Sequence, residues 1–173
     1  MPRYVALLRG VSPMNCKMPE LQRSLEDAGF TDVKTLLSSG NVAFSTPRAA
    51  SAATLRKKLE AAMQAGLGRS FETHVRASQH LQQLIVADPF AAYPLRAGSK
   101  RVVTFLREPL AASPVELPRT HGEACIWGLD GAEVFCSYVP EAQGPVFMQL
   151  LEKTFGKDIT TRTWDTVAKC ASA

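Results

Sequence analysis

Long hydrophobic runs are missing from this sequence of 173 residues. The longest apolar stretch near its start, Tyr4 to Leu8, is closed by Arg9. A membrane-spanning helix needs about 20 apolar residues, and the core of a secretory signal needs about 7–15. We therefore predict neither a membrane span nor a signal peptide, and we expect a cytoplasmic protein.

Cysteine and histidine are few, and their spacing suits neither a metal site nor a disulfide framework. The cysteines are Cys16, Cys125, Cys136 and Cys170, without a C-x-x-C pair, and the three histidines are scattered. The chain also lacks a P-loop, a G-x-G-x-x-G loop and a Ser/His/Asp arrangement. We therefore expect no metal and no cofactor, and the sequence leaves open whether the protein is an enzyme.

Charge of one sign is not concentrated anywhere in the chain. The formal net charge is +4, and no run of five like charges marks a basic arm. Such a modest excess permits a small anionic ligand or a nucleic acid as partner without requiring either. The sequence predicts no membrane partner and gives no oligomeric state.

What is present is a doubled pattern of strands and helices, which predicts an α+β fold. In the first half, strands are expected at Arg3–Arg9, Val33–Leu37, Asn41–Ser45 and Phe71–Arg76. Helices are expected from Pro19 to Gly29, and around Leu55, Leu59 and Met63 with a close near Gly66 and Gly68. The resulting order, β-α-β-β-α-β, is that of a ferredoxin-like unit.

The second half repeats this order more loosely. Strands are expected at Lys100–Arg107, Glu123–Leu129, Ala132–Val139 and Ile159–Arg162, with a helix at Pro145–Phe155. Three prolines between Pro109 and Pro118 leave at most a short first helix. Further helices are expected at Ser78–Ala87 and Thr163–Cys170. We therefore predict duplicated ferredoxin-like βαββαβ subdomains, at residues 1–77 and 100–173, with a linking helix and loop at 78–99.

The first strand of each half is apolar on both faces, so both faces of each sheet need cover. We expect each half to cover the open face of the other. This weighs against the use of RNA-recognition domains, which need an exposed sheet with stacking aromatics. Tyr4 and Phe44 are therefore expected in the core.

The hairpin in the second half allows a prediction about its cysteines. A two-residue turn at Asp130-Gly131 would pair Leu129 with Ala132, and would therefore place Cys125 opposite Cys136. Because the cytosol is reducing, we expect two buried free thiols that face each other rather than a disulfide.

Polar and basic residues are expected to meet at one edge of the first sheet. With the strand order 4-1-3-2, the end of the first strand lies beside the turn that precedes the third. The loop that follows leads to a helix N-terminus, where backbone N–H groups favour an anion. The candidate ligand-binding residues at this Arg9/Asn41 edge are Arg9, Gly10, Asn15, Lys17, Ser39, Gly40 and Asn41. Alternatively, Gly40 and Asn41 make a hairpin turn and Arg9 meets a local carboxylate.

The C-terminal segment is a second candidate. Arg162, Trp164, Asp165 and Lys169 would lie at a polar pocket between the halves. The alternative is structural, since Thr163 can cap a helix, Asp165 suits its first turn and Trp164 can anchor it.

Several motifs resemble the bacterial family called domain of unknown function 1697. They are Ala6–Gly10 (ALLRG), Ser39–Val42 (SGNV) and Arg162–Lys169 (RTWDTVAK), and the resemblance runs from end to end. It implies an α+β fold without an assigned activity. The chain departs from the family at Val11–Asn15, where Ile-Asn-Val-Gly-Gly is usual, and at Asp165, where a neutral amide is usual. The first change puts a backbone cradle in doubt, and the second would repel an anion nearby.

Three functions stay open at this point. The first is a binding module for a small phosphate-bearing ligand at the Arg9/Asn41 edge. The second is a hydrolase that positions water against a phosphate or an acyl phosphate, for which the sequence offers no candidate base. The third is a module that binds nucleic acid or another protein.

Overall fold

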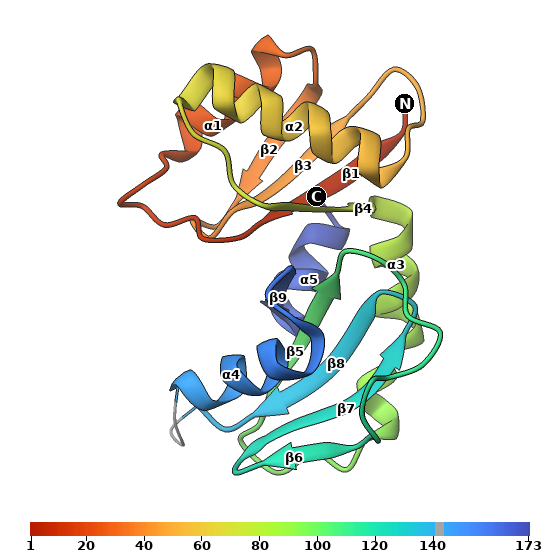
Figure 1. Cartoon of the computed structure of the whole chain (residues 1–173). Coiled ribbons are helices and arrows are strands. Elements are labelled where there is room, and N and C mark those ends of the chain that lie inside the picture. Colours follow the sequence, from red (N-terminus) through yellow and green to blue (C-terminus); the bar gives the residue numbers. More distant parts are fainter. Residues whose placement is uncertain (141–143) are drawn as a thin grey trace. The chain divides into compact units, whose positions relative to one another are not determined.

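The structure is a computed structural model that describes residues 1–140 and 144–173 (Figure 1). The chain has an α+β fold and divides into two compact units. The first unit comprises Met1–Val86 together with Ala168–Ala173, and the second comprises Ala87–Val167. Among the described residues, no helix has both the length and the apolar character that a membrane crossing requires.

The first unit follows the predicted order of elements. They are β1 (Arg3–Leu8), α1 (Met18–Asp27), β2 (Thr31–Leu36), β3 (Asn41–Ser45), α2 (Ala52–Leu67), β4 (Thr73–Ala77) and α3 (Ser78–Ala87). The four strands form one antiparallel sheet in the order β2-β3-β1-β4. The strand order expected for a ferredoxin-like unit is therefore present here, with α1 and α2 on one face of the sheet (Figure 1).

Strand β1 is buried on both faces, as its apolar sequence predicts. Tyr4, Ala6 and Leu8 point into a core shared with the two helices. Val5 and Leu7 alternate with them, point to the opposite face and are also fully buried. Both aromatic candidates for RNA stacking lie in the core, because Tyr4 and Phe44 stack on each other and are closed off from solvent.

The second unit contains a larger sheet and fewer helices. Its elements are η1 (Pro89–Ala92), β5 (Lys100–Leu106), β6 (Arg119–His121), β7 (Ala124–Asp130), β8 (Glu133–Tyr138), α4 (Gly144–Phe155), β9 (Ile159–Thr163) and the start of α5 (Trp164–Ala171). The strand order is β6-β7-β8-β5-β9. Without β6, this is the strand order of the first unit.

The second unit corrects the prediction of a complete second βαββαβ pattern. No helix lies between β5 and β7; the chain there runs irregularly through Pro109, Pro114 and Pro118 and then adds β6 at the edge of the sheet. Each proline lacks an N–H donor and disfavours helical geometry at the residue before it. The duplication therefore holds for strand order and not for the helices.

The two faces of the second sheet are covered by different groups. Helix α4 packs its side chains, including Leu150 and Leu151, on one face. On the other face, Phe90 of η1 contacts the rings of Phe135 and Trp164 edge-on, at centroid distances of 5.7 and 5.1 Å. These contacts fix the start of α5 against the sheet.

The cysteine register in the β7–β8 hairpin differs from the prediction. Cys125 lies opposite Ser137, and Cys136 lies opposite Ile126, so the two thiols are not a facing pair. The turn residues are Gly131-Ala132 instead of Asp130-Gly131, which moves the pairing by two residues, and a register shift at Trp127 takes back one of these two. The prediction of buried free thiols is confirmed, since all four cysteines are free and buried.

The units group the chain differently from the predicted boundaries at 77 and 100. Helix α3 belongs almost entirely to the first unit, and so does the C-terminus. Gln82 Nε2 donates to the carbonyl of Ala171 at 3.0 Å, and Arg3 Nε donates to the carbonyl of Ala173 at 2.9 Å. These hydrogen bonds bring the last residues to the first unit.

We expect the thiols to be poor nucleophiles in the folded protein. Burial raises the pKa of Cys125 from 9.0 to about 11, and also raises the pKa of Cys16 and Cys136. A higher pKa leaves less thiolate at neutral pH, so iodoacetamide at pH 7.5 should alkylate Cys125 about a hundredfold more slowly than a free cysteine, and should also alkylate Cys16 and Cys136 more slowly. Mass spectrometry before and after unfolding in guanidinium checks this. Rapid alkylation of the folded chain would contradict it.

Candidate functional site

The Arg9/Asn41 edge forms as the strand order predicts. Leu7 pairs with Asn41, and the Leu8 N–H donates to the carbonyl of Gly40 at 2.8 Å. Gly40 has a φ of +91°, and a Cβ there would lie 3.0 Å from the Val11 side chain. The turn before β3 and the loop after β1 are therefore in close contact, and glycine is the residue that permits it.

Asn41 points into the protein at this edge. Its side chain is fully buried, and Nδ2 donates to the Leu36 carbonyl at 3.0 Å and to Ser39 Oγ at 3.1 Å. These bonds tie the end of β2 to the start of β3 across the turn. The amide thus has a structural task, in line with the hairpin alternative.

The loop between β1 and α1 uses its asparagine in the same way. Asn15 Oδ1 accepts from the Ser12 N–H at 2.9 Å, while Nδ2 donates to the Gly10 carbonyl at 2.8 Å. Lys17 is exposed at the N-cap of α1, and Arg9 is half-buried after β1. Arg9 and Lys17 are therefore the charged candidates in the first unit, and the side-chain amides of Asn15 and Asn41 stabilise the local loop and turn.

The candidates near the C-terminus have different environments. Arg162 is buried in β9, and its Nη1 donates to Thr160 Oγ1 and to the Thr161 carbonyl, both at 2.7 Å. Trp164 is 8% exposed and packs against Phe90. Asp165 and Lys169 are exposed, one helical turn apart on α5. Arg162 and Trp164 are thus buried and stabilise the second unit, whereas the Asp165 side chain is accessible to solvent.

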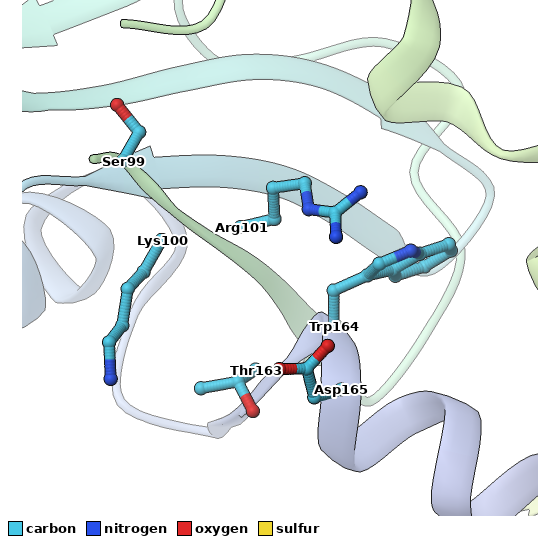
Figure 2. A pocket seen from close by; sticks show the side chains of 6 residues that line it. All are labelled: Ser99, Lys100, Arg101, Thr163, Trp164 and Asp165. Carbon is cyan, nitrogen blue, oxygen red and sulfur yellow. The ribbon is translucent and has the colours of Figure 1, made fainter. Parts of the chain in front are cut away.

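A pocket of about 190 Å³ lies where β5 begins beside the end of β9. Val102 pairs with Thr163, which brings the residues before Val102 next to the first turn of α5. The pocket is lined by Ser99, Lys100, Arg101, Thr163, Trp164 and Asp165 (Figure 2). Two of the predicted site residues, Trp164 and Asp165, therefore contribute to it.

The pocket combines two cations with one carboxylate. In Figure 2, the Arg101 guanidinium lies on the side of the Trp164 indole, and the Lys100 ammonium lies on the opposite side. Thr163 Oγ1 accepts from the Thr166 N–H at 3.3 Å, so Thr163 caps α5, whose positive end adds to the local field. With Asp165 included, one positive charge remains in excess. This chemistry suits one small anionic group with further hydroxyls.

Sequence reasoning missed Ser99, Lys100 and Arg101, although the signal was available. In the order 4-1-3-2, the start of the first strand lies beside the end of the fourth. In the second half, that rule places Lys100 and Arg101 near Thr163, and the structure agrees, because Thr163 pairs with Val102, the residue that follows them.

A comparison with family models finds one that covers most of the chain. The model described as "Protein of unknown function (DUF1697)" matches residues 1–135. The chain belongs to this family. The family predicted from the sequence is therefore confirmed, and membership assigns no activity to this DUF1697 protein.

A solved structure shares the fold of this DUF1697 protein. It is described as the structure of the conserved bacterial protein SP0830 from Streptococcus pneumoniae. The two chains are 20% identical with a TM-score of 0.73, and the alignment covers 99% of this chain and 97% of the other. No match is found among curated proteins. At this identity the likeness establishes the fold and says nothing about chemistry.

Proposed function

We propose that this protein is a binding module for a small phosphate-bearing ligand, held in the pocket between the start of β5 and the first turn of α5. The observation that carries the proposal is that Lys100 and Arg101 line the same pocket of about 190 Å³. Arginine offers a planar fork of donors to phosphate oxygens, and lysine offers a mobile point charge. The hydroxyls of Ser99 and Thr163 supply neutral hydrogen bonds.

Asp165 restricts which anions would bind. Its carboxylate lines the same pocket as Lys100 and Arg101 and repels a highly charged group. It also accepts hydrogen bonds, which favours a phosphate monoester whose organic part carries a hydroxyl or an amine. The proposed ligand class is therefore a small polar phosphate monoester rather than a polyphosphate.

The Arg9/Asn41 edge is a second location for the same ligand class. Arg9 and Lys17 are its cations, beside the N-terminus of α1. It ranks behind the pocket because Asn41 and Asn15 direct their amides to backbone and side-chain partners of the chain itself. Variants at both places separate the two.

We expect glycerol phosphate to raise the melting temperature of the protein, and Arg101→Ala to abolish that shift. The loss of one charge-assisted hydrogen bond costs about 1.5–3 kcal/mol of binding free energy. The affinity of Arg101→Ala for glycerol phosphate, measured by calorimetry, should therefore fall at least about tenfold. Asp165→Asn should strengthen binding, because it removes the repelling charge. Both residues are exposed, so both variants should fold.

Two matched variants complete this test. Arg119→Ala removes an exposed arginine from β6 of the same unit and should leave binding unchanged. Loss of binding in Arg9→Ala, with Arg101→Ala unaffected, would transfer the site to the Arg9/Asn41 edge. No shift with any phosphate monoester would remove the proposal, and release of inorganic phosphate from the ester would favour the hydrolase instead.

A further inference from the structure

We propose a second ligand site in the first unit, which would take a small monocarboxylic acid with an apolar body. The site is a pocket of about 400 Å³ beside the segment that joins β3 to α2. This site shares no residue with the phosphate pocket, so the proposal made for it does not depend on the proposed function.

The inner surface of this carboxylate pocket is apolar. Phe30 and Leu55 line it, and both are buried, with 6% and 1% of their surface exposed. Ala28 and Ala50 add further aliphatic surface. A volume in the range of about 300–1,000 Å³ with mostly apolar walls is typical of small-molecule sites. An aromatic ring or a short alkyl chain would bury its surface here.

The charges at the pocket have one sign. Arg48 and Lys58 line it, and both are exposed. None of its lining residues, all of which fall in the described part of the chain, is acidic. Two cations beside an apolar wall match a ligand with one anionic end, and arginine can bind a carboxylate with two parallel hydrogen bonds.

The end of α1 at this pocket limits the ligand to one negative charge. Helix α1 ends at Asp27, and the next two residues, Ala28 and Gly29, line the pocket. The C-terminal end of a helix carries partial negative charge, so it disfavours a second anionic group. A ligand whose carboxylate lies near Arg48 and Lys58, and whose apolar body lies against Phe30, matches both the charge and the apolar surface of the pocket.

The segment that forms the pocket is held in place by the protein itself. The Tyr4 hydroxyl accepts from the Ala50 N–H at 3.1 Å and donates to the Ala50 carbonyl at 3.3 Å. Thr46 Oγ1 donates to the Arg48 carbonyl at 2.7 Å, and Ser51 Oγ caps α2 by accepting from the Thr54 N–H. A wall already ordered in this way costs a ligand little entropy on binding.

The test uses 3-phenylpropionate as the probe, titrated into the ¹⁵N-labelled full chain and followed by amide chemical shifts. We expect saturable shifts around Phe30, Ala50 and Leu55. Arg48→Ala and Lys58→Ala should each weaken binding about two- to fivefold, which corresponds to one lost ionic contact at an exposed position. Lys57→Ala is the matched control, because Lys57 is an exposed neighbour on the same helix that does not line the pocket.

Two further probes separate charge from apolar contact. The neutral 3-phenylpropanol lacks the carboxylate, and propionate lacks the ring, so both should bind at least about fivefold more weakly than 3-phenylpropionate. The proposal is overturned if 3-phenylpropionate gives no saturable shift, if either partial probe binds equally well, or if Lys57→Ala weakens binding as much as Lys58→Ala.

Discussion

Trp164→Ala should destabilise the second unit and abolish binding in the phosphate pocket. The indole is 8% exposed, meets Phe90 edge-on at 5.1 Å and lines the pocket itself. Truncating a buried tryptophan to alanine costs about 3–5 kcal/mol through lost burial and the cavity left behind. The same ring anchors the first turn of α5, so its loss should also release Thr163 and Asp165 from their positions.

Urea unfolding followed by circular dichroism measures the stability loss, and calorimetry with glycerol phosphate measures the affinity. Trp164→Phe is the matched variant, because it keeps an aromatic ring for Phe90 to contact. It should retain most of the stability and a measurable affinity. If Trp164→Ala unfolded at the same urea concentration as the parent protein, the anchoring role of this residue would be wrong.

Gly66→Ala should destabilise the first unit, although alanine favours helices. Replacing an exposed helical glycine by alanine usually stabilises by about 1 kcal/mol. At position 66 a Cβ would lie 2.2 Å from Ser24 Oγ, 2.6 Å from Ser24 Cβ and 3.1 Å from Ser24 Cα. The methyl group would therefore push α2 away from α1, and overpacking of this kind costs about 1–3 kcal/mol. Thermal or urea unfolding gives the sign directly.

A second substitution at Ser24 tests the cause of this effect. Ser24→Ala removes the clashing Oγ but keeps the Cβ at 2.6 Å, so it should rescue Gly66→Ala only in part, because that Cβ still clashes. Ser24→Gly removes it and should recover stability in the double variant, which appears as a favourable coupling energy in a double-mutant cycle. If the double variants with Ser24→Ala and with Ser24→Gly were equally stable, the clash with the Cβ of residue 24 would not be the cause of the destabilisation.

The local elements follow closely from the sequence because their signals are local. The helix predicted at Ser78–Ala87 is observed at those residues as α3, and the third strand is observed at Asn41–Ser45. The strand order of the first unit also follows, because few topologies accommodate that order of elements. The meeting of the β1 end with the turn before β3 is a direct consequence of this order.

The roles of individual residues follow less well. Gly66 looks like a helix end, yet α2 continues to Leu67 and ends at Gly68, whose φ is +74°. Gly66 instead permits the close approach of α1, which no signal along α2 reveals. Asn41 resembles a ligand-binding amide in the sequence, but the folded turn buries its side chain and directs it to the Leu36 carbonyl. Gly66 is constrained by Ser24, which is distant in the sequence, and Asn41 is constrained by a turn whose geometry the sequence does not specify.

The sequence by itself determined the α+β fold and the burial of β1 on both faces, because periodicity and composition encode how each element meets its surroundings, and its motifs indicated the family. The tertiary structure decided the register of the β7–β8 hairpin, where the turn at Gly131-Ala132 and the shift at Trp127 together place Ser137 opposite Cys125. The tertiary structure also decided which charged residues line one pocket, since only the pairing of β5 with β9 brings Lys100 and Asp165 to the same pocket. Such juxtapositions depend on contacts between residues far apart in the chain, and these arise only when the chain folds.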